Sequence, residues 1–426
     1  MFLAYRILTN FLYPFFILII FFRKFLKKED AIRYKEKIFR SHFNVKRKVN
    51  KRLIWFHAAS IGEFKSILPI IEELDLQHKD LEFLITTNTL SSSNLLKDKI
   101  KKINVSHRFF PLDVIFLIRN FLILWKPSAI FLVDSEIWPN LILEAKKNNI
   151  PVAIINARIT TKSFNRWMIF RDTANKLFSS LNFCFASNMQ TKDYLTDLKV
   201  RNVYFNGNLK FYNKINKNKI FNINEKFLSA TNFWIAASTH EPEEFFCLKA
   251  HLELKKNIKN LVTIIAPRHI NRARKIKSLS ESLNLNTQIL NKDEKILNNK
   301  EVIILNTFGE LQNYFEFAKS VFIGKSITKR LKNEGGQNPI DAAFLNCKIY
   351  HGPFVYNFIE VYQILAENKI SKEIKNFKEL ANYLADDFTT NKNENREFSH
   401  IIDKLGQKTF KNTMEFLNKF INNDFK

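Results

Sequence analysis

Cysteine and glycine are both scarce in this chain of 426 residues. The three cysteines are far apart, so the sequence has neither a disulfide framework nor the spacing of a cysteine metal site, and it fits a reducing compartment. Four of the eight glycines lie between residues 324 and 352. A chain that avoids glycine keeps it where φ is positive or where a backbone comes close. We therefore expect Gly335 and Gly336 to admit a ligand; an ordinary tight turn is the alternative.

Acidic residues are also under-represented, with 41 against 67 lysines and arginines, which gives a formal net charge of +26. Such an excess attracts polyanions: nucleic acid, an anionic membrane or a phosphorylated substrate. Drift toward lysine in an AT-rich genome explains the charge equally well. The sequence contains no helix-turn-helix, no aromatic RNP run and no zinc-finger spacing. A basic nucleic-acid-binding protein is therefore kept only as the alternative from another functional class.

The N-terminus is strongly apolar. Residues 2–22 read FLAYRILTNFLYPFFILIIFF, and a helix over all of them would span about 31 Å, roughly the hydrocarbon core of a bilayer. The stretch from Phe11 to Phe22 alone is too short to span. We expect residues 1–28 to be a membrane anchor, and a spanning helix and an in-plane helix both remain open. The basic residues that follow place this side at the cytoplasm.

Short apolar runs alternate with longer amphipathic stretches from residue 52 onward, which is typical of parallel strands joined by crossover helices. A stretch rich in lysine and asparagine separates two such series. The pattern predicts an α/β fold with Rossmann-like domains at 45–215 and 216–395, followed by a helix at 396–426. The expected strands are 53–58, 82–87, 129–134, 151–156, 202–207, 233–238, 261–266, 301–306, 320–325 and 348–352.

Polar loops follow several strands of the first series. In HAASIGEFKSILPII, Glu63 falls in the first turn of a helix, where a carboxylate could accept the proton of an acceptor hydroxyl. Ser60-x-x-Glu63 also matches a capping box, in which Glu63 only satisfies backbone N–H groups. VDSEIWPN presents Glu136 after another strand, and GNLK presents Lys210.

Four loops at successive strand ends of the second series carry polar residues, in STHEPEE, APRHINR, NTFGEL and NEGGQNPIDAA. Hydroxyl groups and N–H groups at helix starts suit an anion, and Arg268 suits a phosphate. Together these loops predict one face that binds a nucleotide. The sequence has no Walker A motif, GxGxxG, HExxH or Cys/His cluster, so ATPase, dinucleotide and metal sites lack support.

The ordered set of motifs resembles the transferases of 3-deoxy-D-manno-octulosonic acid (Kdo). The matching stretches are HAASIGE, FFPLD, SEIWPN, IPVAIINARIT, STHEPEE, APRH, FGEL, GGQNP and GPFVYNF, in family order between residues 55 and 360. The resemblance implies a GT-B glycosyltransferase, with two Rossmann-like domains facing a cleft and an N-terminal membrane anchor helix. It also implies CMP-Kdo as the donor and a lipid A precursor, lipid IVA, as the acceptor.

The resemblance further implies roles for single residues. Glu63 falls on the family's general-base position, while Glu136 and Lys210 fall on positions credited with transition-state stabilisation. The family's nucleotide-binding positions correspond here to Pro267, Arg268, Gly309, Glu310, Leu311, Gly335, Gly336, Gln337 and Asn338.

The sequence departs from the family pattern near this last loop. Gln337 stands where the family usually has histidine, Asp341 stands near a usual glutamate, and Lys325 replaces a usual glycine. The contacts of that loop are therefore the least defined part of the resemblance.

The implied reaction is one displacement with inversion, on the cytoplasmic side of the cell inner membrane. The anionic membrane surface is the expected partner besides the two substrates. We expect no metal, no cofactor, no specific nucleic acid and no obligate protein partner. A GT-B transferase that uses a UDP-sugar is the alternative enzyme.

Overall fold

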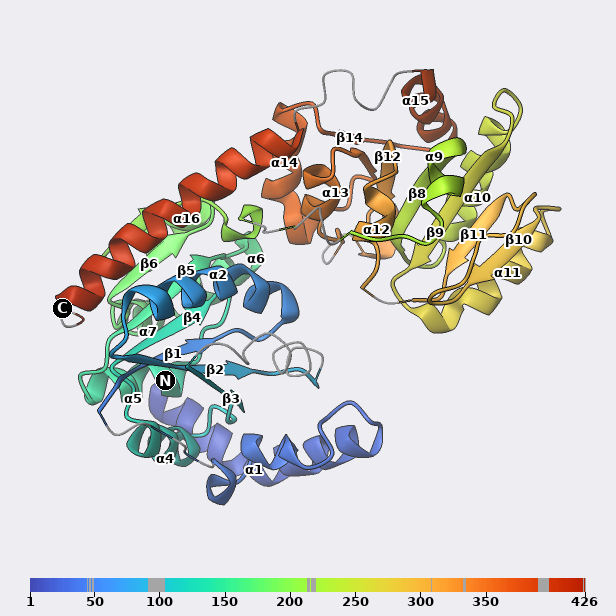
Figure 1. Cartoon of the computed structure of the whole chain (residues 1–426). Helices are drawn as coiled ribbons and strands as arrows, with labels where there is room; N and C mark the ends of the chain where they lie inside the picture. The colour runs from blue at the N-terminus through green and yellow to red at the C-terminus, as the bar shows by residue number, and fades with distance from the viewer. Residues whose placement is uncertain are drawn as a thin grey trace. The chain divides into compact units, whose positions relative to one another are not determined.

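The computed structural model describes residues 1–43, 45, 47, 50–90, 104–212, 215, 220–307, 309–331, 335–389, 398–423 and 425. The chain forms two compact units (Figure 1). Unit 1 comprises Met1–Tyr212 and Leu405–Lys426, and unit 2 comprises Asn213–Lys404. The N-terminal helix and the end of the chain thus both belong to unit 1, whereas the sequence suggested separate segments.

Unit 1 is built on a seven-stranded parallel sheet with the order β3-β2-β1-β4-β5-β6-β7. Strand β1 lies inside the sheet and pairs with β2 and β4, so that His57 lies opposite both Thr86 and Leu132. The carboxyl ends of these strands therefore meet at one edge of the sheet. The strands are β1 Arg52–His57, β2 Leu81–Thr87, β3 Val105–Phe109, β4 Ala129–Val133, β5 Val152–Ala157, β6 Phe183–Ala186 and β7 Val203–Phe205.

Helices cover both faces of this sheet. Trp55 and Phe56 are neighbours in β1 but point into separate cores, as the alternation along a strand requires. The Trp55 core contains residues of α4, α5, α7 and α8, and the Phe56 core contains residues of α2 and α16. Figure 1 shows α16 running beside β6. The helices are α1 Phe2–Phe25, α2 Ile61–Gln77, α4 Ile115–Trp125, α5 Pro139–Lys147, α6 Thr161–Met168, α7 Arg171–Phe178, α8 Met189–Asp197 and α16 Phe398–Asn422, with 3-10 turns η1 Arg33–Lys37, η2 Arg40–His42 and η4 Leu209–Phe211.

The N-terminal helix α1 packs against unit 1 along one side. The Tyr5 hydroxyl donates to Asp113 Oδ2 at 2.9 Å, and the Arg6 guanidinium pairs with Glu144 at 2.8 Å. Tyr13 meets Phe116 of α4 edge-on at 5.0 Å and donates to the Ile38 carbonyl. Among the described residues, α1 is the one helix long and apolar enough to cross a membrane, and only 11% of its most apolar window is buried.

Unit 2 repeats the architecture, with the strand order β10-β11-β9-β8-β12-β13-β14, all parallel. Helices α10, α11 and α15 pack on one face of the sheet. The strands are β8 Asn232–Thr239, β9 Leu261–Pro267, β10 Thr287–Leu290, β11 Val302–Leu305, β12 Ser320–Ile323, β13 Lys348–His351 and β14 Ser371–Glu373. The helices are α9 Glu225–Ala230, α10 Glu243–Leu254, α11 Ala273–Glu281, α12 Gln312–Phe315, α13 Ile340–Phe344, α14 Ile359–Glu367 and α15 Phe377–Thr389, with 3-10 turns η6 Ile270–Arg272, η7 Lys329–Leu331 and η8 Tyr356–Phe358.

Candidate active site

The carboxyl edge of the unit 1 sheet gathers the polar side chains singled out in the first half of the sequence. Strand β1 ends at His57 and leads into α2, while β4 ends at Val133 and leads into the loop before α5. Because β1 and β4 are parallel neighbours, the loop with Glu63 and the loop with Glu136 lie at the same edge.

Glu63 sits in the first turn of α2, and its carboxylate is held by the start of that helix. It accepts hydrogen bonds from the Ala59 N–H at 2.7 Å and the Ser60 hydroxyl at 2.8 Å. The Ser60 oxygen in turn accepts from the Glu63 N–H at 3.3 Å. The capping contacts that the sequence suggested are thus present, and they fix the position of the carboxylate.

The environment of Glu63 also changes its acidity. Burial, followed by the negative charges of Asp134 and Glu136, raises the pKa of Glu63 to about 7, although the hydrogen bonds from Ser60 and Ala59 oppose the rise. A carboxyl group with such a pKa is ionised in part at neutral pH and binds a proton more strongly than an ordinary glutamate. Those are the properties of a general base.

Lys210 reaches the same edge through an ion pair with Asp134. Its ammonium group lies 2.5 Å from Asp134 Oδ2. The turn that carries Lys210 is fixed by two asparagines: Asn156 Oδ1 accepts from the Leu209 N–H at 2.9 Å, and Asn208 Oδ1 accepts from the Lys210 N–H at 2.9 Å. The sequence identified Lys210 but not its partner Asp134, which is directly after β4.

Glu136, in the loop after β4, has two nitrogen partners on one carboxylate oxygen. His57 Nε2 lies 3.1 Å from Glu136 Oε2, and Trp138 Nε1 donates to the same oxygen at 2.8 Å. The three catalytic candidates therefore share one edge, and the charges of Asp134 and Glu136 are close enough to act on Glu63.

A carboxylate from another loop, Asp113, fixes the start of α5. Its oxygens accept from the backbone N–H groups of Asn140 and Leu141, both at 2.9 Å. The sequence did not identify this cap, because Asp113 in the FFPLD stretch is 27 residues away from Asn140.

In unit 2, the predicted nucleotide-binding residues lie at several strand ends. Pro267 is the last residue of β9, and the exposed Arg268 follows it. The backbone N–H of Arg268 donates to the Thr239 carbonyl of β8 at 3.0 Å. Residues 309–311 precede α12, whose Gln312 donates to Asp341 at the start of α13 at 3.0 Å. The loops after β8 and β9 thus adjoin each other, as do the segments before α12 and α13.

A buried glutamate that the sequence did not identify, Glu243, ties the loops after β8 and β12 together. Its carboxylate accepts from the backbone N–H groups of His240, Lys325, Ser326 and Ile327, at distances from 2.6 to 3.1 Å. Lys325 has a φ of +60°, which explains why a glycine would suit this position.

The glycine pair after these loops packs against its own chain. A Cβ on Gly335 would lie 2.1 Å from the Phe354 carbonyl oxygen, and Gly336 has a φ of +88°. The Gly336 N–H also donates to the Lys325 carbonyl at 2.5 Å. Intramolecular packing therefore requires both glycines, and the approach of a ligand to them stays a prediction. Gln337 and Asn338 follow directly; the Gln337 carbonyl accepts from the Tyr362 hydroxyl at 3.0 Å.

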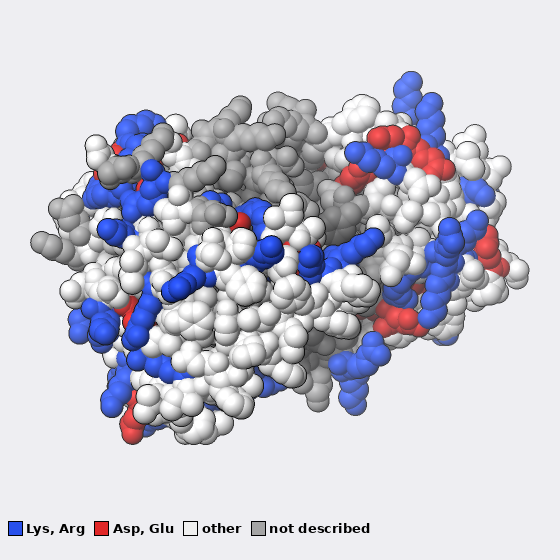
Figure 2. All heavy atoms as spheres, turned by 90° about the horizontal axis from the view of Figure 1, so that it is seen from below, with Lys and Arg blue, Asp and Glu red and all other residues white. Residues whose placement is uncertain are grey.

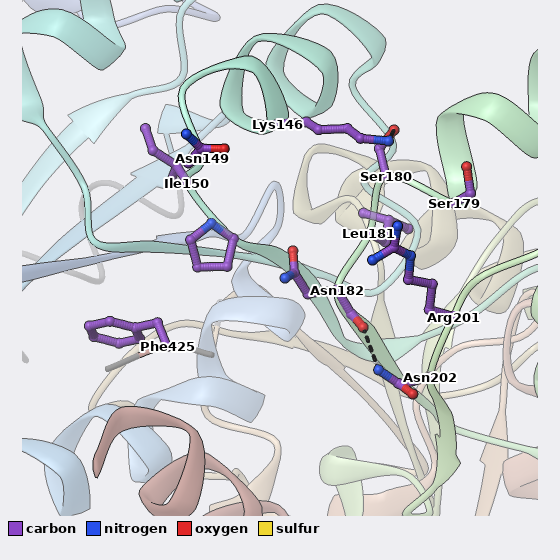
Figure 3. Close-up of a pocket in the computed structure, with 11 residues that line it drawn as sticks. Lys146, Asn149, Ile150, Ser179, Ser180, Leu181, Asn182, Arg201, Asn202 and Phe425 are labelled. Atoms are coloured by element: carbon purple, nitrogen blue, oxygen red, sulfur yellow. Dashed lines mark hydrogen bonds between the residues drawn. The ribbon is translucent and has the colours of Figure 1, made fainter. Parts of the chain in front are cut away.

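A separate pocket of about 340 Å³ lies at the opposite edge of the unit 1 sheet (Figure 3). It is lined by Pro151, Asn182 and Asn202, which precede β5, β6 and β7, and by Lys146 and Arg201. The pocket contains none of the predicted site residues. Within the described part of the chain, no cluster of three or more His, Cys, Asp or Glu side chains is arranged to hold a metal ion.

Two parallel α/β units with polar loops at the carboxyl edges of their sheets define a GT-B architecture. The structure is similar to UDP-GlcNAc 2-epimerase from Neisseria meningitidis, with a TM-score of 0.55 and 14% identity over 87% of this chain and all of that one. This likeness supports the GT-B fold. The class defined by the fold is that of GT-B proteins.

Sequence comparisons identify the family. Residues 33–213 match the family described as 3-deoxy-D-manno-octulosonic-acid transferase. A transferase of that name from Rickettsia bellii is 30% identical over 93% of this chain and 92% of its own length, and one from Aquifex aeolicus is 27% identical over 79% of this chain and 86% of its own. The chain belongs to the Kdo transferase family and is a glycosyltransferase, which confirms the resemblance and favours Kdo transfer over the two alternatives.

Proposed function

We propose that this enzyme transfers Kdo from CMP-Kdo to a lipid A precursor, lipid IVA, in one inverting displacement with Glu63 as the general base. The observation that carries the proposal is the partly buried carboxylate of Glu63, with its pKa raised to about 7, at the carboxyl edge of the unit 1 sheet. Family membership supports Kdo as the transferred sugar.

In the proposed step, the acceptor hydroxyl attacks the anomeric carbon of Kdo while the bond from that carbon to the CMP phosphate oxygen breaks. Glu63 takes the hydroxyl proton, and CMP leaves with the bonding electron pair. Attack opposite the leaving group inverts the anomeric centre. One carboxylate suffices as base, and the step invokes no metal or cofactor.

The other predicted site residues are proposed to interact with the charges that develop on the sugar and on CMP. Positive charge builds on the sugar ring as the bond to CMP breaks, and Glu136 together with the Asp134–Lys210 pair is expected to stabilise the separated charges. Arg268 is exposed directly after β9, and we propose that its guanidinium binds the CMP phosphate. The N–H groups and side chains at 309–311 and 335–338 are proposed to complete the nucleotide site.

The position of α1 supports attachment in the plane of an anionic inner-membrane surface. A spanning helix would have to leave unit 1, and this would break the contacts of Tyr5, Arg6 and Tyr13 with the folded unit. The other side of α1 presents exposed apolar residues, and Figure 2, which views the molecule from the side of α1 in Figure 1, shows more basic than acidic residues around uncharged surface. The exposed apolar side chains include Leu3, Ile7, Phe11, Phe15, Leu18, Phe22 and Phe25.

The proposal is tested by mass spectrometry of the products formed from purified enzyme, CMP-Kdo and a tetra-acylated lipid A precursor. We expect the mass of the acceptor to rise by that of Kdo, with release of CMP. UDP-GlcNAc in place of CMP-Kdo serves as the donor control. Transfer from the UDP-sugar, with none from CMP-Kdo, would replace the proposal by the alternative enzyme.

A further inference from the structure

His57 is a buried histidine at the edge of the candidate site with no assigned role. It is the last residue of β1 and is fully buried. Its ring stacks on Phe110 at 4.0 Å, which fixes the ring plane. Both ring nitrogens have partners: Nδ1 lies 2.9 Å from the Thr86 hydroxyl, and Nε2 lies 3.1 Å from Glu136 Oε2.

The hydrogen bonds around His57 have a defined direction. The indole of Trp55 is only a donor, and it donates to the Thr86 hydroxyl oxygen at 2.9 Å. That hydroxyl can still donate its own proton to His57 Nδ1. An Nδ1 that accepts this proton leaves Nε2 as the protonated nitrogen of a neutral imidazole, which then donates to Glu136 Oε2. The ionised carboxylate of Glu136 can only accept, so its contact with Nε2 favours this tautomer over the one protonated on Nδ1.

We propose that His57 is a positioning residue for Glu136, and that the Thr86 hydroxyl selects the His57 tautomer that holds it. The proposal rests on the role suggested above for Glu136. Glu136 also receives a hydrogen bond from Trp138, but Trp138 belongs to the same loop and moves with it. The bond from His57 connects the Glu136 carboxylate to a strand in the centre of the sheet.

The competing tautomer is visible in the same geometry. The Thr86 carbonyl oxygen lies 3.2 Å from His57 Nδ1, so an Nδ1–H could donate there. Nε2 would then present a lone pair to the carboxylate of Glu136 and repel it. The Thr86 hydroxyl opposes this arrangement by offering its proton to Nδ1.

A pair of variants at one position tests the role of Nε2. In His57→Gln, the amide NH₂ reaches the region of Nε2 and still donates to Glu136, whereas the shorter amide in His57→Asn reaches only the region of Nδ1. We expect His57→Asn to lower kcat about 10- to 100-fold, since misplacement of a site group by roughly 1 Å costs this much. The KM for CMP-Kdo should change less than about threefold, and His57→Gln should recover most of kcat.

A histidine in unit 2 provides the matched control. His251 is also fully buried and lies 2.8 Å from a threonine hydroxyl, that of Thr263, but it is at none of the site loops. His251→Asn should lower the melting temperature as His57→Asn does, yet leave kcat unchanged. Equal losses of kcat in the two variants would show that His57 acts only through stability, which would overturn the proposal.

The tautomer is tested at position 86. Thr86→Val removes the hydroxyl at nearly the same volume, and Thr86→Ser keeps it. We expect Val, but not Ser, to lower kcat in the wild-type background, and Val to add less than about twofold in the His57→Asn background, because both changes act through one hydrogen bond. Multiplicative losses in the double variant would overturn the assignment of the tautomer to Thr86.

Glu136→Gln separates this inference from the proposed function. If Glu136→Gln loses kcat while His57→Asn retains it, Glu136 keeps its role and the positioning inference fails. If Glu136→Gln is as active as the wild type, the role of Glu136 fails and the inference fails with it. Parallel losses in both variants, with recovery in His57→Gln, support both.

Discussion

Replacing Glu63 by glutamine removes one negative charge from the carboxyl edge of the unit 1 sheet and little volume. The glutamine amide oxygen can still accept from the Ala59 N–H, and its NH₂ group can donate to the Ser60 hydroxyl oxygen, so the start of α2 should keep its geometry. It cannot accept a proton at neutral pH. A general base contributes roughly 10²- to 10⁴-fold, so we expect kcat to fall by that factor, with CMP-Kdo binding nearly unchanged.

The pH dependence of the wild type provides a second measure of the same group. With a pKa of about 7, only about a tenth of Glu63 is ionised at pH 6, so kcat should be about tenfold below its plateau there. The residual kcat of Glu63→Gln should lack this acid limb. Steady-state rates between pH 5.5 and 8.5 compare the two enzymes.

We expect Glu63→Gln to be at least as stable as the wild type at pH 8, although its kcat is lower. The rise in the pKa of Glu63 from 4.5 to about 7 corresponds to about 3 kcal/mol of cost for the ionised form. The folded state binds this proton more tightly than the unfolded state, so wild-type stability falls as pH rises from about 4.5 to 7. Glu63→Gln avoids this cost, and its melting temperature at pH 8 should equal or exceed that of the wild type, an advantage that disappears near pH 5.

The control is Glu72→Gln, which removes a charge from the same helix nine residues further on. It should change neither kcat nor its pH profile. Near-normal turnover in Glu63→Gln, combined with a lower melting temperature in Glu63→Ala, would refute the base and leave Glu63 as a helix cap alone. Loss of turnover in both Gln variants would point to a general charge effect.

Three further outcomes follow from the site and from α1. The double variant Phe15→Gln/Leu18→Gln changes two residues on the exposed side of α1 and should reduce co-sedimentation with anionic vesicles without lowering the melting temperature. Unchanged vesicle binding of this variant in high salt would place the anchor elsewhere. Arg268→Ala should raise the KM for CMP-Kdo roughly 10- to 100-fold through the loss of one charge-assisted contact, while Arg274→Ala on α11 should not. Asp134→Asn removes the largest charge effect on the pKa of Glu63, so the acid limb of kcat should move to lower pH; a limb at the wild-type position would contradict this coupling.

The sequence predicted the α/β architecture because the central strands of both sheets are continuous apolar runs. Strands such as β4 and β9 are buried along their whole length, and this burial is what a run of Val, Ile, Leu and Phe indicates. The strands it missed are β3, β6, β10 and β14, which have three to five residues each. Strands β3 and β14 lie at sheet edges and contain charged residues, which interrupt an apolar pattern.

The sequence predicted at which edge of the sheet the candidate site residues lie, but not which side chains they contact. A parallel sheet brings the residues after its strands to one edge, and so the sequence could group Glu63 with Glu136 and Lys210. It could not pair Lys210 with Asp134, 76 residues away, or connect His57 with Thr86, 29 residues away. Those partnerships depend on strand register and on the turn at 209–211, and the residue types alone do not determine either.

The sequence left two roles open for Glu63, a general base and a helix cap, and one arrangement of its side chain is compatible with both. The cap holds the Glu63 carboxylate against the first turn of α2, where it is largely removed from water. Removal from water is also the largest cause of its raised pKa. A glutamate that left the helix start for solvent would lose both the fixed position and the affinity for a proton. The capping contacts therefore hold this carboxylate where burial raises its pKa to about 7, although the two hydrogen bonds themselves lower the pKa.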